Sequence, residues 1–426
     1  MKKSINLSIF YSLFILTLIY VFVYSIIKGF EKESWEITEF LINYQGGFVR
    51  RGLLGEILLN IYNFSGLNPY IIILLLCISA YFLLLFFFIK SFRKNGYPIF
   101  ILPFVFFLGN PIINNFWVRK DILIILFFIL IIYFSTKKSN LYLILINFLF
   151  MTGLLIHESI GFFCFPILLL ILANRERFFD KTKTASIKSI ILSFLKLLPS
   201  TITFMSVLYY KGSQKTAEIV WESWKPVNFP IQSNSSEIPG AIDTLSWSIK
   251  KGLSLGIETL NNFDGGVYAP LAWIIILTLI YYLLTNTDKL NVKILNHMPN
   301  KNFNKTNISN ILIIQFFSVI PLFILGWDYC RWVFLWVISS FAIIILIPEE
   351  NLSLIFPKHV HIISSKINII LDSILGQSKD FMFLLCLIIC FPNCNWNLLF
   401  CIFNSSIIII LNFISHIILF IKYAVS

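Results

Sequence analysis

Charged side chains are scarce in this sequence. They make up 13% of its 426 residues, whereas hydrophobic residues make up 58%, and 45 residues are phenylalanine. Apolar runs long enough to cross a membrane recur along the chain, and the core of a soluble protein does not require such runs. The scarcity of charge therefore excludes an ordinary soluble domain. We predict an all-α, polytopic integral membrane protein that forms one membrane-embedded domain over residues 1–426.

Cysteine is also sparse. The chain has seven cysteines and no paired spacing within a compact loop, so the sequence indicates neither a disulfide framework nor a zinc site. Cys386, Cys390 and Cys394 share a helical stripe, but they lie in an apolar segment where thiolates are costly. We predict no metal site and no cofactor. The formal net charge of +12 reflects loop topology, and we expect membrane lipids but no nucleic acid among the partners.

The distribution of lysine and arginine predicts the topology. Loops rich in these residues alternate with loops that have few of them, as the positive-inside rule requires. No cleavage site follows the first apolar run, so we predict an uncleaved first helix and both termini in the cytoplasm. The segments 28–68 and 211–267 are then extracytoplasmic, and the second is the longest soluble loop. We predict about twelve spans, at residues 7–27, 70–89, 97–108, 122–134, 141–156, 161–173, 190–210, 268–284, 311–325, 333–347, 381–391 and 398–421, with an interfacial segment at 359–375.

The segment 43–56 combines glycines with two adjacent arginines, in a chain that otherwise avoids charge. If residues 47–59 form an amphipathic helix, Gly47, Arg51 and Gly55 share one stripe. Arg51 then projects with almost no side chain above or below it, which leaves room for a bulky anion. Its guanidinium offers planar, paired donors suited to phosphate or carboxylate. The alternative is an anchor for lipid headgroups, but such an anchor has no use for the glycines.

Motif-like groups of polar residues fall at the outer ends of the predicted helices, while the cytoplasmic loops hold scattered lysines. Ionisable groups at the membrane edge are costly unless they are paired or solvated, so they tend to mark sites. Their shared depth and side predict a single cavity at the extracytoplasmic face. The alternative is chance, because helix ends are where charge is least costly. The groups are Arg50/Arg51/Glu56, Arg119-Lys120-Asp121, His157-Glu158, Asp264-Gly265-Gly266 and Asp328/Arg331.

Several of these groups have a specific chemical interpretation. A carboxylate beside an imidazole, as at His157 and Glu158, can accept or relay a proton near neutral pH. Adjacent helical residues diverge by about 100°, however, so these two side chains need not touch. Asp121 alternatively caps a helix start. Asp328 and Arg331 stand three residues apart and alternatively form a plain ion pair.

An outer-face cavity with arginines, carboxylates and a histidine suits glycosyl transfer from a polyprenyl-diphosphate donor. Arginines hold the diphosphate, a carboxylate or histidine deprotonates the acceptor hydroxyl, and aromatic side chains orient the sugars. Trp221, Trp224 and Trp247 in the long outer loop suit stacking on sugars, and they are equally typical of tryptophans at a membrane interface. We predict His157, Glu158 and Asp328 as catalytic residues, and as substrate-binding residues Arg50, Arg51, Glu56, Arg119, Asp121, Arg331, Gly46 and Gly47.

In size, helix number, large late outer loop and Ile/Phe-rich character, the whole chain resembles Wzy-type O-antigen or capsule repeat-unit polymerases. The resemblance is carried by short elements, namely Phe48-Val49-Arg50-Arg51-Gly52, Arg119-Lys120-Asp121, His157-Glu158 and Asp328-Tyr329-Cys330-Arg331-Trp332. It implies a bacterial inner-membrane enzyme that joins undecaprenyl-diphosphate-linked oligosaccharides at the periplasmic face. Functional outer-loop arginines of that family map onto Arg50, Arg51, Arg119 and Arg331. A chain-length regulator is a further candidate partner, and no family motif lies in the segment 211–267.

Two rival functions share many of these features. A membrane glycosyltransferase that takes one sugar from a polyprenyl-phosphate donor usually has an acidic residue in its first outer loop, and Glu33, Glu36, Glu39 or Glu56 fits that description. A transporter or flippase places ionisable residues near the middle of the membrane and has broken helices in matching halves. Lys196 is the clearest mid-helix charge in this sequence, and no halves match.

Overall fold

Helices account for all the regular structure of the residues that the structure describes, which confirms the predicted all-α class. The structure is a computed structural model, and it describes residues 35–97, 101–111, 117–181, 186–227, 238–262, 268–286, 304–326 and 328–376, together with residues 23 and 378. The helices are α2 (Trp35–Phe40), α3 (Gly52–Ser65), α4 (Pro69–Asn95), α5 (Leu102–Phe107), α6 (Asp121–Ser135), α7 (Leu141–Ile156), α8 (Ser159–Asn174), η3 (Arg175–Phe178), α9 (Ile187–Lys196), α10 (Leu198–Tyr209), α11 (Gln214–Glu222), α12 (Gly240–Asp243), η4 (Thr244–Ser246), α13 (Ile249–Asn262), α14 (Tyr268–Thr285), α15 (Lys305–Leu325), α16 (Tyr329–Leu346), α17 (Glu349–Ile355) and α18 (Lys358–Leu375).

Several of these helices are long and apolar enough to cross a membrane. In the described residues, four helices qualify, namely Pro69–Asn95, Ser159–Phe178, Lys305–Leu325 and Tyr329–Leu346. The number of candidate spans rises to 5 if the bent pair α9 and α10 is counted as one span. The prediction of about twelve spans is therefore not met in this part of the chain. The predicted spans 7–27 (except residue 23), 381–391 and 398–421 lie outside the described residues. Shorter apolar helices occupy Asp121–Ser135, Leu141–Ile156 and Trp273–Thr285.

Two predicted spans differ in form from the helices observed. In the described part of the apolar run 97–108, the structure has the short helix α5, of 6 residues, with Pro103 at its start and Gly109 following with a φ of 66°. The run 190–210 is divided into α9 and α10, which meet at an angle of 66°. Pro199 lies at the start of α10, where it lacks the N–H that a continuous helix needs. Lys196, predicted in the middle of a span, is thus the last residue of α9.

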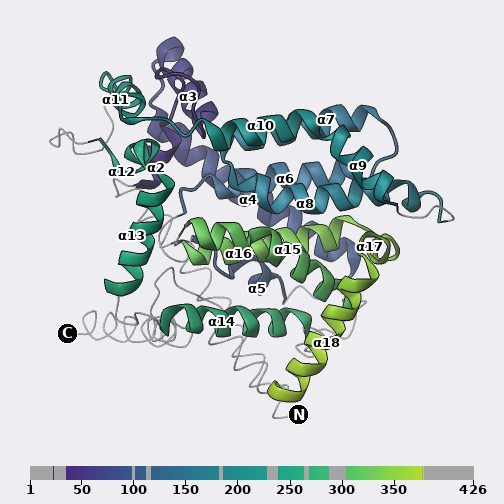
Figure 1. The fold of residues 1–426 in the computed structure, drawn as a ribbon. Coiled ribbons are helices and arrows are strands. Elements are labelled where there is room, and N and C mark those ends of the chain that lie inside the picture. Colours follow the sequence, from purple (N-terminus) through teal and green to yellow (C-terminus); the bar gives the residue numbers. More distant parts are fainter. Residues whose placement is uncertain are drawn as a thin grey trace, which may run out of the picture.

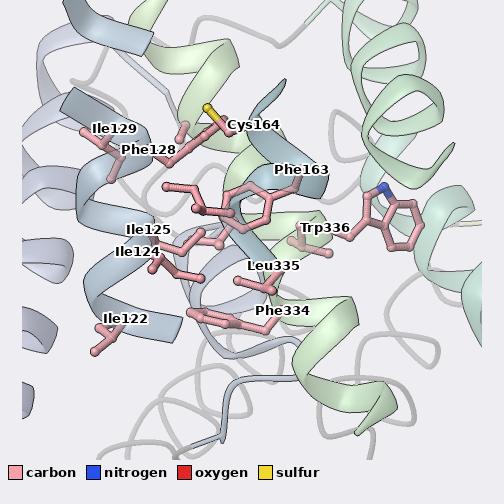
Figure 2. Packing of buried hydrophobic residues seen from close by; sticks show 14 of the residues in the cluster. Ile122, Ile124, Ile125, Phe128, Ile129, Phe163, Cys164, Phe334, Leu335 and Trp336 are labelled. Atoms are coloured by element: carbon pink, nitrogen blue, oxygen red, sulfur yellow. The ribbon is translucent and has the colours of Figure 1, made fainter. Parts of the chain in front are cut away.

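The core lies between α6, α8, α15 and α16. Figure 2 shows Phe128 of α6, Phe163 of α8 and Phe334 of α16 packed in one cluster, and all three are fully buried. In the most apolar stretch of α16, 89% of the residues are buried inside the protein, whereas 39% are buried in the corresponding stretch of α4. Because α4 exposes large apolar side chains such as Phe82 and Phe86, it is a peripheral helix with a lipid-compatible outer face.

The helices place their polar termini at two opposite ends of the bundle. In Figure 1, α6, α8, α10, α15 and α16 run roughly side by side, whereas α13 and α18 cross their direction at opposite ends. One end holds α2, α11 and α12 together with the starts of α6, α8 and α16; we call it the Arg51 end. The other holds α17, α18 and the start of α15; we call it the His361 end.

Parts of the segments 28–68 and 211–267 pack on each other at the Arg51 end. The indole Nε1 of Trp224 donates to the carbonyl oxygen of Leu41 at 2.7 Å, and the amide of Asn43 donates to the hydroxyl of Ser223 at 2.7 Å. Trp224 is 1% exposed, so it is part of the core and not a free stacking surface. The long loop therefore covers the segment that carries the arginines, a role that the sequence did not reveal.

Candidate functional site

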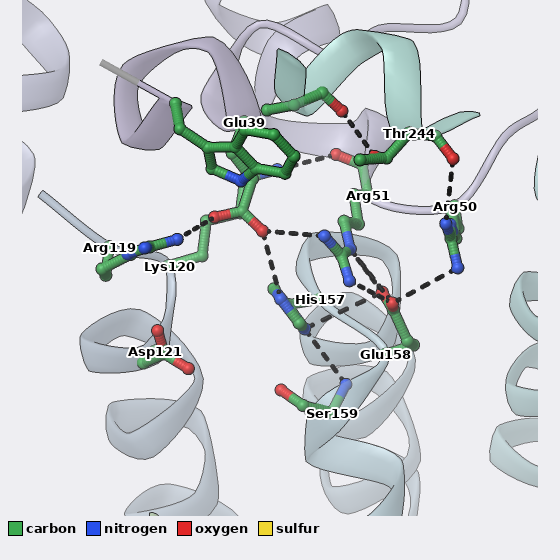
Figure 3. Close-up of polar contacts among 12 residues, drawn as sticks. Glu39, Arg50, Arg51, Arg119, Lys120, Asp121, His157, Glu158, Ser159 and Thr244 are labelled. Atoms are coloured by element: carbon green, nitrogen blue, oxygen red, sulfur yellow. Dashed lines mark hydrogen bonds and ion pairs between the residues drawn. The ribbon is translucent and has the colours of Figure 1, made fainter. Parts of the chain in front are cut away.

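Four of the five predicted polar groups meet at the Arg51 end. Figure 3 shows side chains from α2, the loop after it, the start of α6 and the turn between α7 and α8 directed toward one another. Asp328 and Arg331, at the start of α16, join them through Asp121. The residues Asp264, Gly265 and Gly266 lie outside the described residues. Ion pairs join the described side chains to one another, so they form a connected network.

Glu39 lies at the centre of this network. Its carboxylate is 3.0 Å from Nη1 of Arg51, 3.2 Å from Nε2 of His157 and 3.7 Å from Nη1 of Arg119. Glu36, one turn earlier on the same face of α2, lies 3.6 Å from Nη2 of Arg119. Burial alone raises the pKa of Glu39, but the hydrogen bond from His157 and the charge of Arg51 hold it well below its usual range. Glu39 is therefore ionised at neutral pH.

Arg51 and Glu158 form a close, two-pronged pair within the network. Nε of Arg51 donates to both carboxylate oxygens of Glu158, at 3.0 and 2.8 Å, and Nη2 is 2.5 Å from Oε1. Such a two-pronged contact is the geometry in which a guanidinium binds a carboxylate or phosphate best. Burial raises the pKa of Glu158, but the charges of Arg51 and His157 outweigh it and hold the pKa well below its usual range. Arg51 thus already holds an anion, supplied by the protein itself.

Arg50 is held much more loosely than its neighbour. Nη1 lies 3.8 Å from Glu158, Nη2 donates to the carbonyl oxygen of Thr244 at 3.4 Å, and Nε has no hydrogen-bond partner. The side chain is 27% exposed. Its backbone N–H, by contrast, is fixed by the carbonyl oxygen of Tyr210 at 2.9 Å. Arg50 therefore combines a fixed backbone with a guanidinium that still has donors to offer.

His157 is buried between two carboxylates. It follows the end of α7, is 2% exposed, and its Nδ1 accepts the backbone N–H of Ser159 at 3.1 Å. The neutral ring therefore carries its proton on Nε2, which faces Glu39. Burial and the charge of Arg51 lower the pKa of His157, so the ring is neutral near pH 7. His157 and Glu158 approach each other to 3.8 Å, although they are adjacent in sequence.

Arg331 joins α16 to α6. Its Nε donates to Asp121 at 3.0 Å, its Nη2 lies 2.9 Å from the same carboxylate, and its Nη1 contacts Asp328 at 2.5 Å. The pair predicted at three-residue spacing is thus present, and Asp121 pairs across the bundle in addition to starting α6. Burial raises the pKa of Asp328, but Arg331 and Arg119 lower it overall. These contacts tie the central helix to the site.

The predicted helix over residues 47–59 is wrong. The helix α3 begins at Gly52, and Arg51 precedes it with a left-handed φ of 65°. Gly47 has a φ of 98° in the turn before, so the stripe of Gly47, Arg51 and Gly55 does not form. A Cβ at Gly55 would collide with the carbonyl oxygen of Ile42. This glycine lets two backbones approach each other, and the space is not available to a ligand.

Three further predicted substrate-binding residues, Glu56, Gly46 and Gly47, have no ion pair or hydrogen bond to the network among the described contacts. Glu56 accepts the backbone N–H of Tyr44 at 3.0 Å and the side-chain amide of Gln45 at 3.1 Å, so it orders the turn before α3. A Cβ at Gly46 would press on Thr216 of α11, at 3.0 Å. At Gly47, by contrast, an added Cβ would meet nothing within 4 Å, which leaves this turn open to a ligand.

The three tryptophans that suit either sugar stacking or a membrane interface make contacts within the protein. Trp224 is buried, and Trp247 donates from Nε1 to Asp243 at 2.7 Å. Trp247 packs edge-on against Trp35, with ring centroids 6.3 Å apart. Trp221 is half-buried against the hydrophobic core. These rings fasten α11, α12 and α2 to one another.

Sequence reasoning missed Lys120 as a site residue and did not choose among four acidic candidates in the first loop. Lys120 is fully buried, with its Nζ donating to the carbonyl oxygen of Arg51 at 2.9 Å. Burial lowers its pKa to about 7, against the opposing charge of Glu39. The spacing of Glu36 and Glu39 beside the buried Phe40 is the signal that distinguishes them. In the described ranges, no three His, Cys, Asp or Glu side chains are arranged to hold a metal ion.

Comparisons with protein-family models, with curated proteins and with solved structures found no match to this chain.

Proposed function

We propose that this protein is a glycosyltransferase of the bacterial inner membrane that uses a polyprenyl-linked donor, and that its reaction is polymerisation of undecaprenyl-diphosphate-linked repeat units at the periplasmic face. The observation that supports this most is the pairing of Arg50 and Arg51 with Glu158 in a buried network. One residue of this trio is a proton acceptor, and the other two bind anions. A transferase with a phosphorylated leaving group needs both capacities within one site.

The reaction we propose begins with an exchange of anions. The donor diphosphate replaces the Glu158 carboxylate on the guanidinium groups of Arg50 and Arg51, and the looser Arg50 is its first contact. Without Arg51 beside it, the pKa of Glu158 rises toward its ordinary value, which makes the carboxylate a better base. Glu158 then takes the proton of the acceptor hydroxyl. The hydroxyl oxygen bonds to the anomeric carbon, and the diphosphate leaves with the electron pair of the broken C–O bond.

A second donor class is favoured by a separate observation. Glu36 and Glu39 come from the first predicted outer loop, and both are buried against Arg119 within the network. A buried acidic residue in that loop is the expected mark of transferases that take one sugar from a polyprenyl phosphate. In this version Glu39, beside His157, is the base and a monophosphate leaves. The transporter alternative gains less support, because the charged clusters lie at helix ends.

Purified protein with synthetic donors separates these versions. The wild type is incubated with a lipid-linked repeat unit or with a polyprenyl-phosphate sugar, and released lipid and lengthened glycan are measured. We expect Glu158→Gln to lower the turnover rate per folded molecule roughly 100- to 10,000-fold and Arg50→Ala to weaken donor binding. His359→Gln, at an exposed position on α18, is the control. If Glu39→Gln abolishes turnover and Glu158→Gln does not, the second donor class is assigned. If the protein moves substrate across vesicle membranes without releasing lipid phosphate, both transferase versions are contradicted.

The proposed orientation places the Arg51 end outside and both termini in the cytoplasm. Reporter fusions at Asn60 and Gly240 are then active outside the cytoplasm, and fusions at Lys138 and Lys293 are active inside it. An inside signal at Gly240 overturns the assignment of the site to the periplasmic face.

A further inference from the structure

Lys120 differs from every other cation of the network. Arg50, Arg51, Arg119 and Arg331 each have a carboxylate within 4.0 Å. No described carboxylate lies that close to the amine of Lys120, although the residue is fully buried. Its Nζ donates to the carbonyl oxygen of Arg51 at 2.9 Å and lies 5.6 Å from the centre of the Phe40 ring. A buried amine is costly unless it is hydrogen-bonded, and the carbonyl oxygen of Arg51 is its acceptor among the described residues.

That acceptor belongs to a residue with an unusual backbone. Arg51 is the sole non-glycine residue with a positive φ in the part of the chain that the structure describes. A residue with a Cβ adopts this left-handed conformation at a cost, so surrounding contacts must hold it. Glu39 and Glu158 hold the side chain, and Lys120 holds the carbonyl group.

We propose that Lys120 is a positioning residue for Arg51. It anchors the Arg51 carbonyl oxygen and so keeps the guanidinium in place when a ligand phosphate replaces the Glu158 carboxylate. The reference to a phosphate rests on the proposed function, whereas the anchoring does not. The anchor divides the work of the adjacent arginines. Arg51 stays fixed in the site, and Arg50, with its partly exposed side chain, meets the incoming anion.

The chemistry of the amine suits this task. Either protonation state of Lys120 has an N–H to donate, so the hydrogen bond to Arg51 survives titration of the amine. The charged groups around it are Glu39 of α2, Arg51 of the preceding loop and Glu158 at the start of α8. Because these carry both signs, a neutral donor at position 120 preserves the anchor and a purely apolar side chain does not.

Hydrogen exchange on the full-length protein in detergent tests the anchor without any substrate. Lys120→Met removes the donor and keeps the approximate length of the side chain, whereas Lys120→Gln keeps a donor and removes the charge. We expect the amides of residues 50–55 to exchange roughly tenfold faster in Lys120→Met, the factor that corresponds to losing a hydrogen bond. Most of the protection returns in Lys120→Gln. Lys225→Met, an exposed lysine paired with Glu222, is the control and leaves exchange unchanged.

A double-mutant cycle provides the second test. Glycine adopts a positive φ freely, so Arg51→Gly removes the need for an anchor. If Lys120 acts through Arg51, Lys120→Met lowers the unfolding midpoint less in the Arg51→Gly protein than in the wild type. Equal shifts in both backgrounds overturn the proposal, as does unchanged exchange at residues 50–55 in Lys120→Met. If Lys120→Met does not fold, equal exchange in Lys120→Gln and the wild type supports the anchor, and faster exchange in Lys120→Gln contradicts it.

Activity measurements then separate this inference from the proposed function. For either donor, we expect Lys120→Met to lower kcat with a smaller change in KM, since Arg50 still meets the donor first, and Lys120→Gln to recover most of the rate. If Lys120→Met exchanges faster but the wild type has no transferase activity, the anchor is supported and the proposed function is rejected. Transferase activity that Lys120→Met leaves unchanged supports the function and rejects the anchor.

Discussion

Polar networks occupy both ends of the helix bundle, but they are made of different groups. At the Arg51 end, ionised side chains such as Glu39 and Arg331 are almost fully buried and pair with one another. At the His361 end, hydroxyl, amide and imidazole groups form a partly buried network: Ser364 donates to the Asn310 amide oxygen at 2.6 Å, and the Asn310 amide nitrogen contacts His361 at 2.7 Å. Neutral networks fix helices at a modest cost, whereas buried charge is retained where a site needs it.

The two ends also differ in how their ion pairs meet solvent. Lys305 and Asp372 at the His361 end are 2.8 Å apart, but their side chains are 33% and 23% exposed. Solvent screens such a pair, and the fold depends little on it. Ion pairs of similar length therefore contribute differently to the stability of the same protein, because their burial differs.

Removing one carboxylate at each end gives the largest expected difference. Glu158→Gln leaves Arg51 buried without its main partner and should lower the free energy of unfolding by about 3–5 kcal/mol. Asp372→Asn should lower it by less than about 1 kcal/mol. Unfolding in mixed micelles at increasing denaturant provides the measurement. Equal losses would show that the Arg51 end is not distinct in its energetics.

Two glycine substitutions probe local packing next, with Gly252 in α13 as the uncrowded reference for Gly55 in α3. Gly55→Ala places a methyl group against the backbone oxygen of Ile42, which cannot move aside, and should cost about 3 kcal/mol. Gly252→Ala in α13 meets nothing within 4 Å and should stabilise the protein by about 0.5–1 kcal/mol through helix propensity. The same unfolding assay measures both changes. A tolerated Gly55→Ala would mean that α3 and the loop 41–42 are loosely packed.

The pH dependence of stability distinguishes the acids of the network from the amine of Lys120. The pKa of Glu39 and Glu158 is held well below the ordinary 4.5, so the unfolded chain binds protons first and stability falls as pH drops below about 4.5. The pKa of Lys120 falls from 10.5 to about 7, so the unfolded chain again binds more protons and stability rises between pH 7 and 10.5. Lys120→Met should flatten the alkaline rise and Asp372→Asn should not. Thermal unfolding across this range decides the matter.

Apolar runs and the alternation of charged loops were the sequence patterns that predicted helices and their grouping. The span predicted at 141–156 coincides with α7, because a continuous apolar run ends at polar residues on both sides. Grouping His157-Glu158 with Arg51 was possible because the positive-inside rule assigns both to the same side of the membrane. The partners themselves could not be predicted, since Arg331 finds Asp121 across 210 residues and no local pattern encodes that distance.

Short elements and backbone conformation account for most of the errors. The helix α2 has 6 residues, too few for a periodic pattern to reveal it, so Glu39 was not singled out. Arg51 was expected inside a helix because nothing in its identity signals a positive φ. The break at Leu197 was missed although Lys196 and Pro199 flank it, because the run 190–210 was treated as one span on its overall apolar character.

The separation of Asp121 and Arg331 along the chain affects the order in which they are synthesised. At about 5–20 residues per second, the 210 residues between them take about 10–40 s to synthesise. During that interval the start of α6 is already made, while the arginine that neutralises Asp121 does not yet exist. Until then, water has to solvate the Asp121 carboxylate. An acidic residue in the middle of the apolar helix α6 would be shielded from water during this interval, which favours charges at the helix ends.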